Sequence, residues 1–389
     1  MSEALIGVIN AGSSSLKFSV YASDECLLNG QVEGIGAHPA VKVKSGKGEA
    51  LSPPDFSATP PATAGEALIT LLPWLQGWLA GRPLAAIGHR VVHGGPKYGA
   101  PARVTPALIE ELKAFIPLAP LHQPHNLSSI EAALERNPEL PQVVCFDTAF
   151  HRSIPEVAQV FALPHEMRER GIRRYGFHGL SYEYIASVLP QAAPAIAGGR
   201  VVVAHLGNGA SLCALRAGRS MATTMGFSAL DGLPMGTRCG QLDPAVVLHL
   251  LTTQGMTPKA VEDLLYRKSG MLGLSGISSD FRDLLESDQP RARFAIEVFV
   301  HQVARNIASM AGAMGGLDGI VFTAGVGENA APIREAVCQA CAWMGVDLDQ
   351  AANAAHAALI SAPGSRVGVH VIPTDENLMI ARHTSALLS

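Results

Sequence analysis

Several ionisable side chains of this sequence lie between glycines or directly after apolar runs. Arg90 lies in the segment GHRVVHGG, His178 in YGFHG and Arg238 in MGTRCG, while Asp147 ends the apolar run VVCFD. In apolar or glycine-rich surroundings such groups need a partner or a bound anion. A structural ion pair explains any one of them. Their recurrence in the same kind of setting favours a site for phosphate and carboxylate groups.

A turn of small polar residues separates two apolar runs near the start of the chain. The segment NAGSSSLK, residues 10–17, leaves backbone N–H groups open to an anion and adds three hydroxyls. Because side chains alternate along a strand, Lys17 shares a face with Ser15. The segment therefore suits polyphosphate binding, and an ordinary hairpin with a solvated lysine is the alternative.

A weak internal repeat relates the two halves of the chain. INAGSSSL at residues 9–16 can be laid over HLGNGASL at residues 205–212, and each copy lies between two apolar runs. The repeat predicts a duplicated domain with a strand, a tight turn and a second strand in each half. Chance similarity of glycine- and serine-rich turns is the alternative.

A second glycine motif points to a different class of protein. The P-loop pattern is absent, but GVGENA at residues 325–330 fits a dinucleotide-binding turn, and Asp347 follows at the required spacing. A dehydrogenase is therefore an alternative. Glu328 argues against it, because a carboxylate within the turn would oppose a bound pyrophosphate.

Strand-like and helical segments alternate along the chain, which predicts α/β domains with partly parallel sheets. Helices are predicted to begin at Thr105-Pro106, Asp243-Pro244 and Thr257-Pro258, where a side-chain oxygen precedes a proline. Cys338 and Cys341 are predicted to be small core residues of a helix. The predicted strands are 5–9, 16–21, 41–44, 143–146, 201–205, 320–323 and 367–372.

Composition excludes several classes of protein. The chain has 389 residues, enough for two domains, and 48% are hydrophobic against 16% charged. A net charge of −4 provides no basic surface for nucleic acid. We expect no membrane span and no signal peptide. Six scattered cysteines are typical of a reducing compartment.

Together these segments resemble the acetate kinase family. The resemblance rests on residues 8–17, HRVVHGG at 89–95, FDTAFH at 146–151, HLGNG at 205–209 and GEN at 327–329, and it extends to PTDE at 373–376. It implies an α/β fold of two duplicated actin-like, ribonuclease H-like domains with an ATP cleft between them. The implied N-terminal domain, residues 1–150 with 374–389, carries the acyl substrate and magnesium. The implied C-terminal domain, residues 151–373, carries the nucleotide and the dimer contact.

The resemblance also implies a function and a set of site residues. The implied enzyme is a cytoplasmic homodimer that reversibly transfers a phosphoryl group from ATP to acetate, forming acetyl phosphate and ADP, with Mg²⁺ (or Mn²⁺) as cofactor. The implied catalytic residues are Asp147, His178 and Arg238. Arg90 would bind the acetate carboxylate, Val92, Leu121 and Phe177 its methyl group, and Asn10 and Glu376 the metal. The implied ATP-binding residues are Lys17, His205, Leu206, Gly207, Asn208, Gly209, Asp280, Phe281, Arg282, Gly325, Val326, Gly327, Glu328 and Asn329.

Acetate chemistry agrees with these roles. Acetate is ionised at pH 7, so its oxygen attacks phosphorus without a strong base. The enzyme must instead supply alignment and positive charge. Asp147 is therefore interpreted as positioning a metal, a water or an arginine.

Three positions depart from the family pattern. Ala229 replaces a pocket-lining proline, Gln241 replaces an aspartate expected to support Arg238, and Ala324 replaces a glycine before Gly325. The first departure makes propionate a credible substrate, since one methylene changes discrimination by only ~1–3 kcal/mol. A non-catalytic ATP-binding module is the third interpretation, and the predicted acyl-site residues argue against it.

Overall fold

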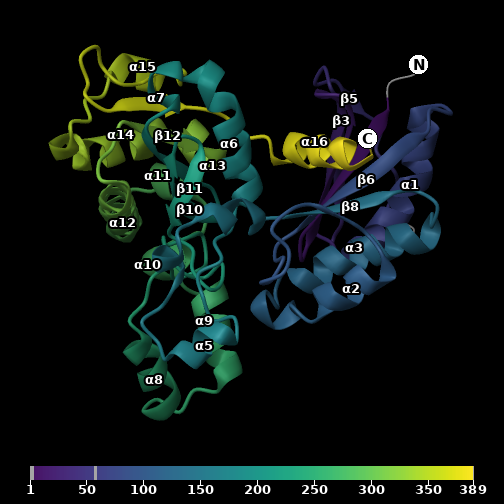
Figure 1. Cartoon of the computed structure of the whole chain (residues 1–389), viewed down its shortest axis with the longest axis horizontal. Helices are drawn as coiled ribbons and strands as arrows, with labels where there is room; N and C mark the ends of the chain where they lie inside the picture. Colours follow the sequence, from purple (N-terminus) through teal and green to yellow (C-terminus); the bar gives the residue numbers. More distant parts are fainter. Residues whose placement is uncertain (1–3, 57–58, 389) are drawn as a thin grey trace. The chain divides into compact units, whose positions relative to one another are not determined.

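A computed structural model describes residues 4–56 and 59–388 of the chain. The described residues form two compact units (Figure 1). Unit 1 comprises the chain up to Phe150 together with the residues from Asp375 onward, and unit 2 comprises His151–Thr374. In the described part of the chain, no helix is long and apolar enough to cross a membrane.

Unit 1 is built on an eight-stranded sheet in the order β5-β4-β3-β2-β1-β6-β8-β7. Helix α16 packs on β6, β1 and β8, while α1 packs on α3 and β2. The strands are β1 (Leu5–Ala11), β2 (Ser15–Ala22), β3 (Glu25–Glu33), β4 (Ala40–Ser45), β5 (Ala50–Leu51), β6 (Leu84–Val91), β7 (Ala102–Arg103) and β8 (Gln142–Phe146). The helices are α1 (Ala64–Leu79), α2 (Pro106–Lys113), α3 (Gln123–Arg136) and α16 (Glu376–Leu388).

Unit 2 contains a five-stranded sheet in the order β11-β10-β9-β12-β13. The strands are β9 (Arg200–Leu206), β10 (Ala210–Arg216), β11 (Arg219–Thr223), β12 (Gly319–Thr323) and β13 (Gly368–Val371). The helices are α4 (Glu156–Gln159), α5 (His165–Glu169), α6 (Gly179–Ala192), α7 (Pro194–Ala197), α8 (Pro244–Thr252), α9 (Pro258–Arg267), α10 (Gly270–Ser275), α11 (Phe281–Glu286), α12 (Pro290–Met314), α13 (Ala324–Asn329), α14 (Ala331–Ala340) and α15 (Gln350–Ala354). Short 3-10 turns occur at Ile116–Leu118, Ala149–Ser153 and Ala342–Met344.

The two sheets share one topology. In unit 1, β3, β2 and β1 run antiparallel, and β6 and β8 then continue in parallel with β1. In unit 2, β11, β10 and β9 run antiparallel, and β12 and β13 then continue in parallel with β9. The half-chain repeat therefore corresponds to β1–β2 in one sheet and β9–β10 in the other. The predicted duplicated α/β architecture is confirmed.

The predicted local signals are also present. The side chains of Thr105, Asp243 and Thr257 accept from Leu108 N, Ala245 N and Ala260 N at 3.1, 2.8 and 3.2 Å, so each caps its helix. All the predicted strands form, with ends shifted by one or two residues. Strands β3, β5, β7 and β11 were not predicted. In β3, polar residues interrupt the apolar pattern.

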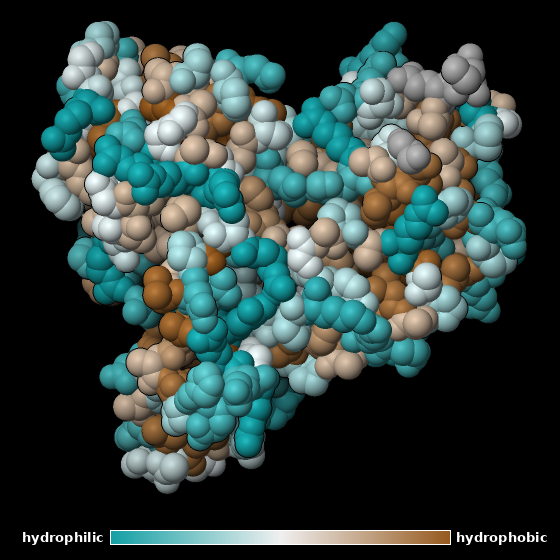
Figure 2. All heavy atoms as spheres, in the orientation of Figure 1, coloured by the Kyte–Doolittle hydropathy of each residue, from teal (hydrophilic) through white to brown (hydrophobic). Residues whose placement is uncertain are grey.

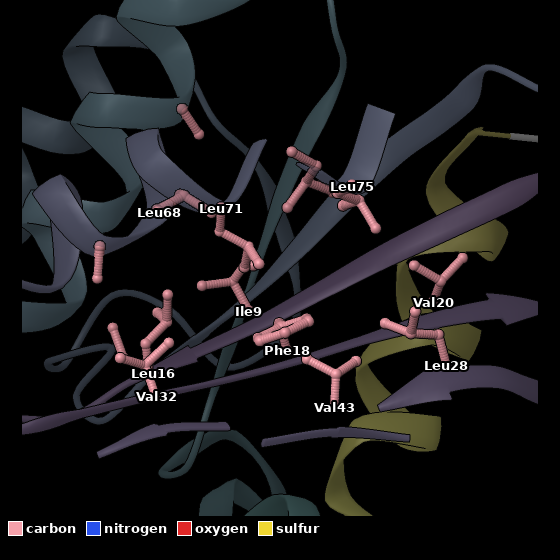
Figure 3. Close-up of a cluster of buried hydrophobic side chains, with 14 of the residues drawn as sticks. Ile9, Leu16, Phe18, Val20, Leu28, Val32, Val43, Leu68, Leu71 and Leu75 are labelled. Carbon is pink, nitrogen blue, oxygen red and sulfur yellow. The ribbon is translucent and has the colours of Figure 1, made fainter. Parts of the chain in front are cut away.

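The core of unit 1 lies between its sheet and α1. Figure 3 shows Phe18 of β2 among side chains of the neighbouring strands and of α1, including Ile9 and Leu71. Phe18 pairs with Gly30 of β3, and its ring covers that glycine. A Cβ atom at Gly30 would lie 2.2 Å from Phe18 Cζ, so a side chain there has no room. Gly30 thus allows the aromatic ring to lie flat on the sheet.

We therefore expect Gly30→Ala to lower the stability of the protein. Displacing the buried ring costs about 1–3 kcal/mol, and each kcal/mol lowers the Tm by about 2–4 °C in domains of this size. Calorimetry measures the shift. Gly77→Ala is the control, because Gly77 lies in α1 with nothing near its Cβ position, and alanine there should stabilise the helix by about 0.5–1 kcal/mol. A Gly30→Ala protein as stable as the parent would contradict this account of the core.

Candidate active site

The end of β6 and the residue after β8 are joined by an ion pair. Arg90 Nε donates to Asp147 Oδ1 at 2.8 Å, and Nη2 donates to Oδ2 at 2.6 Å. A third guanidinium nitrogen, Nη1, donates to Asn10 Oδ1 at 3.3 Å. Because β1, β6 and β8 are parallel neighbours, these residues meet at the carboxyl ends of the three strands.

The ion pair engages both carboxylate oxygens of Asp147. They accept from Arg90, and the Asp147 side chain is buried. Burial by itself would lower the pKa of Arg90, but the charges of Asp147 and Glu376 raise it above its ordinary value. The guanidinium therefore stays charged, and Asp147 orients it. Nη1 and Nη2 each carry a second hydrogen beyond the ones donated to Asn10 and Asp147.

The turn after β1 carries further sequence-predicted residues. Gly12 N donates to Ser15 O at 2.7 Å and closes the turn, while Ser13 and Ser14 are exposed. Asn10 and Lys17 are cross-strand partners, so they lie side by side. Glu376 begins α16 and lies close enough to Arg90 to affect its pKa. Unit 1 thus gathers cationic side chains, hydroxyl groups, and amide and carboxylate oxygens near the carboxyl ends of its parallel strands.

Two residues of α3 that the sequence analysis missed hold these strand ends together. Asn126 Oδ1 accepts from Val92 N at 3.0 Å, and its Nδ2 donates to Ala11 O at 2.6 Å, which bridges the ends of β1 and β6. Gln123 accepts from His93 N and donates to His93 O. The signal in the sequence was a run of amides at the start of an amphipathic helix. The role of these amides depends on the strand ends that they contact, which only the folded structure brings beside α3.

In unit 2, His178 occupies a strained backbone position. Its φ is 57°, in the left-handed region that non-glycine residues rarely adopt, and it immediately precedes α6. The buried His151 stabilises this turn by bonding to Phe177 O through Nε2 at 2.8 Å. Burial lowers the pKa of His151 to about 4, so this histidine is neutral.

His178 and Arg238 converge on the turn between β9 and β10. A Cβ atom at Gly209 would lie 3.0 Å from Arg238 Nη2 and 3.2 Å from His178 Nε2. Nearby, a Cβ at Gly236 would lie 2.1 Å from Asn208 Oδ1, so the loop bearing Arg238 also requires glycine for its close approach. The structure thus brings three of the predicted segments of unit 2 to one point.

His178 also stacks on His205. The ring centroids are 4.2 Å apart and the ring planes differ by 21°. At an effective dielectric constant of ~20, two positive charges at that separation repel by about 4 kcal/mol. The stack therefore disfavours simultaneous protonation of both rings.

A pocket of about 680 Å³ adjoins the same turn. Phe281 is buried against Phe299, with ring centroids 4.6 Å apart, whereas Asp280 and Arg282 pair with each other nearer the surface. The hydrogen bonds from Arg282 lower the pKa of Asp280. The pocket is lined by Gly207, Asn208, Ser279, Asp280, Phe281, Arg282, Leu285, Gly325, Val326, Asn329, Ala330 and Pro332. It therefore unites three segments that the sequence analysis assigned to the nucleotide.

The carboxylate of Glu328 folds back onto its own turn. Its Oε1 accepts from Ala324 N at 2.7 Å and from Thr374 N at 3.1 Å. The fully buried Arg334 donates to Gly327 O and Glu328 O at 3.0 and 2.8 Å and so ties down the end of α13. Glu328 is thus a structural acceptor, and Arg334 is a positioning residue that the sequence analysis missed.

Comparison with known proteins places this arrangement in a family. The sequence model of the acetokinase family matches residues 5–382. The chain belongs to the acetokinase family. It is 54% identical to the acetate kinase of Rhodopseudomonas palustris, over 98% of each chain. As a member of this family the protein is a phosphotransferase, which decides against the dehydrogenase suggested by residues 325–330.

Solved structures of the family support the fold. The structure resembles the acetate kinase of Porphyromonas gingivalis, with a TM-score of 0.87 and 35% identity over 99% of this chain and 100% of that one. It also resembles a propionate kinase from Francisella tularensis, with a TM-score of 0.88 and 35% identity over 98% and 99%. The predicted actin-like fold class is confirmed.

The departures from the family pattern have structural explanations. Arg238 Nη1 donates to Ala229 O at 2.7 Å, so residue 229 supports the arginine through its backbone. Gln241 Oε1 accepts a hydrogen bond from Arg305 of α12. Ala324 has a φ of 65°, which explains why glycine suits that position.

The ion pair in unit 1 generates a test. We expect Asp147→Asn to lower kcat/KM for acetate by about 10- to 100-fold, because one charge-assisted hydrogen bond is lost and the remaining amide donor opposes a guanidinium donor. Steady-state assays of acyl phosphate formation measure the effect.

Asp24→Asn is the matched control, because Asp24 forms a similar two-point ion pair with Arg382. We expect its kinetics to be unchanged. Near-full turnover by Asp147→Asn would exclude the orienting role of Asp147.

Proposed function

We propose that this protein transfers the γ-phosphoryl group of ATP to acetate, forming acetyl phosphate and ADP, and also catalyses the reverse reaction. The convergence of His178 Nε2 and Arg238 Nη2 at Gly209 carries the proposal. A cation and an N–H donor aimed at one point, next to an open backbone turn, suit a phosphoryl group whose charge is spread over three oxygens.

The acceptor is held by Arg90. Acetate would lie against the Nη1 and Nη2 edge that Asp147 leaves open, with one oxygen directed at phosphorus. A bond forms between that oxygen and the γ-phosphorus while the bond to the bridging oxygen of ADP breaks. ADP leaves with the electron pair, and no proton is removed from acetate, so Asp147 need not act as a base.

The nucleotide would occupy the 680 Å³ pocket of unit 2. Its phosphates would reach the turn His205–Gly209, and its nucleoside would lie between residues 280–282 and Gly325–Asn329. Lys17, exposed beside Asn10, would contact the transferred phosphate from unit 1. His178 and Arg238 would donate to the equatorial oxygens of that phosphate as it moves.

Asn10 and Glu376 would hold magnesium. The amide oxygen and the carboxylate are the hard oxygen donors that Mg²⁺ and Mn²⁺ prefer, and few protein ligands are needed when phosphates and waters complete the shell. Among the described residues no group of three His, Cys, Asp or Glu side chains could form a full protein cage. The bound ion would neutralise phosphate charge.

Apolar side chains would set the acyl specificity. Val92 and Phe177 are buried, and Leu121 is half-buried in the turn before α3. With alanine at position 229 in place of proline, we propose that propionate is also accepted, and the similarity to a propionate kinase supports this.

The reaction can be tested by trapping acyl phosphate as a hydroxamate in the presence of ATP and Mg²⁺. We expect product with acetate, product with propionate at a kcat/KM within about 10- to 200-fold of that for acetate, and less with butyrate. Adding EDTA should abolish product, because phosphate charge is then unscreened.

Reactions without a carboxylate are the control. ATP binding with no acyl hydroxamate would favour the non-catalytic ATP-binding module, and a strong preference for butyrate would defeat the acetate assignment.

We also propose a cytoplasmic location. Burial raises the pKa of Cys213, Cys338 and Cys341 to about 12, so these thiols stay protonated. Buried, protonated cysteines scattered through a long chain are typical of a reducing compartment. Cys338 and Cys341 are core residues, as predicted.

Helix α8 supports a homodimer. It has the apolar sequence PAVVLHLLT, yet it contains no buried residue, and Leu248 is 60% exposed. Val157 and Leu163, from the segment 155–163 of the same unit, are 85% and 55% exposed. Figure 2 shows hydrophobic atoms at the surface of the lobe that contains α8. We propose that a second copy of the chain covers this surface.

Leu248→Glu should convert the dimer to a monomer, because a charge would be buried in the apolar contact. Light scattering after size-exclusion chromatography measures the mass, 40.7 kDa for one chain. Leu359→Glu, at a 53% exposed leucine elsewhere in unit 2, is the control and should remain a dimer. A parent protein that is monomeric would refute the proposal.

A further inference from the structure

Each of the two stacked imidazoles is bonded through Nδ1 to a fully buried serine. Ser211 Oγ lies 2.9 Å from His178 Nδ1, and Ser181 Oγ lies 2.8 Å from His205 Nδ1. Ser211 belongs to β10 and Ser181 to α6, so two different elements approach the histidine pair from behind. The Nε2 side of His178 faces Gly209 and Arg238.

A third hydroxyl determines the direction of the bond to His205. Thr374 Oγ1 donates to Ser181 Oγ at 2.9 Å. Ser181 Oγ therefore serves as the acceptor in that contact, and its own hydrogen is available for His205 Nδ1. An imidazole nitrogen that accepts carries no hydrogen, so a bond donated by Ser181 to Nδ1 places the hydrogen of the neutral His205 ring on Nε2.

The second serine has an equivalent partner. Tyr182 OH is hydrogen-bonded to Ser211 Oγ. A phenol is a stronger acid than an alcohol and is the better donor, which favours donation from Tyr182 to Ser211 and leaves the hydrogen of Ser211 for His178 Nδ1. The neutral His178 ring then also bears its hydrogen on Nε2, the atom that faces Gly209.

We propose that Ser181 and Ser211 are positioning residues that fix the two histidines as neutral Nε2–H donors. The inference rests on the proposed function, in which His178 donates to the transferred phosphoryl group. With Nδ1 committed to a serine, the ring keeps a donor on Nε2 without a second proton. Donation by His178 then persists above pH 6.5, where an ordinary histidine loses its charge.

The surroundings of His178 agree with a neutral ring. The titratable and charged groups found beside it are His205 on β9, Tyr182 on α6 and Arg238 from the loop after β11. The guanidinium of Arg238 opposes a positive charge on His178. A neutral donor avoids that repulsion and still presents an N–H group to phosphate.

The tautomers can be measured directly by NMR on the whole protein labelled with ¹⁵N-histidine, without substrates. Long-range proton–nitrogen spectra distinguish a ring protonated on Nε2 from one protonated on Nδ1. We expect Nε2–H at both His178 and His205 between pH 7 and 8. Nδ1–H at either ring would overturn the assignment for that ring. This result does not depend on phosphotransferase activity, so failure here is distinguishable from failure of the proposed function.

Turnover provides the second readout. In Ser211→Ala the neutral ring of His178 is free to place its hydrogen on Nδ1, and only the imidazolium keeps both donors. We expect the ratio of kcat for Ser211→Ala to kcat for the parent to fall about 3- to 10-fold from pH 6 to pH 8. The ratio removes pH effects common to both proteins, and a purely structural serine would not change it with pH.

Two variants complete the test. Ser211→Thr retains a hydroxyl, so its kcat relative to the parent should not change between pH 6 and pH 8. Ser220→Ala removes an equally buried serine from His151 Nδ1, 2.9 Å away, and its kcat ratio should not vary with pH. A flat ratio in Ser211→Ala, or the same slope in Ser220→Ala, would overturn the positioning role.

Discussion

Parallel strand pairing is the constraint on which both groups of site residues depend. In unit 1 the parallel strands β1, β6 and β8 end at one edge of the sheet, and Asn10, Arg90 and Asp147 lie at or just beyond those ends. In unit 2 the parallel strands β9, β12 and β13 likewise end together. The turn after β9, the short helix α13 and Thr374 follow from them. Residues far apart in sequence are thus brought within hydrogen-bond distance by backbone pairing alone.

Around these strand ends the charged groups have local hydrogen-bond or ion-pair partners. Arg90 is fully engaged on one side by Asp147, Glu328 accepts from two backbone amides, and Arg334 donates to carbonyls at the end of α13. A chain with only 16% charged residues cannot leave such groups unsatisfied in its interior. In unit 2, His178 Nε2 and Arg238 Nη2 remain directed at the turn that contains Gly209.

Two of the six non-glycine residues with positive φ in the described part of the chain lie in the same places. His178 and Ala324 both adopt positive φ, and each adjoins a turn that requires close approach. Left-handed backbone costs a non-glycine residue about 1–2 kcal/mol. The bond from His151 to Phe177 O and the bond from Ala324 N to Glu328 oppose relaxation of these turns. Such positions are where local preference and global packing disagree.

The sequence by itself determined which segments end strands, where helices are capped, and that one α/β unit is used twice, because periodicity, caps and glycine turns are local properties. It also identified Arg90, Asp147, His178 and Arg238 as candidates, since ionisable groups between glycines are unusual in so apolar a chain. Only the tertiary structure decided their partners. Asp147 pairs with Arg90, Gln241 contacts Arg305, and Asn126, Ser181, Ser211 and Arg334 support the site from elements distant in sequence. Hydrogen-bond partners depend on distances of a few ångströms between separate elements, and those distances arise only when strand register and helix packing are set.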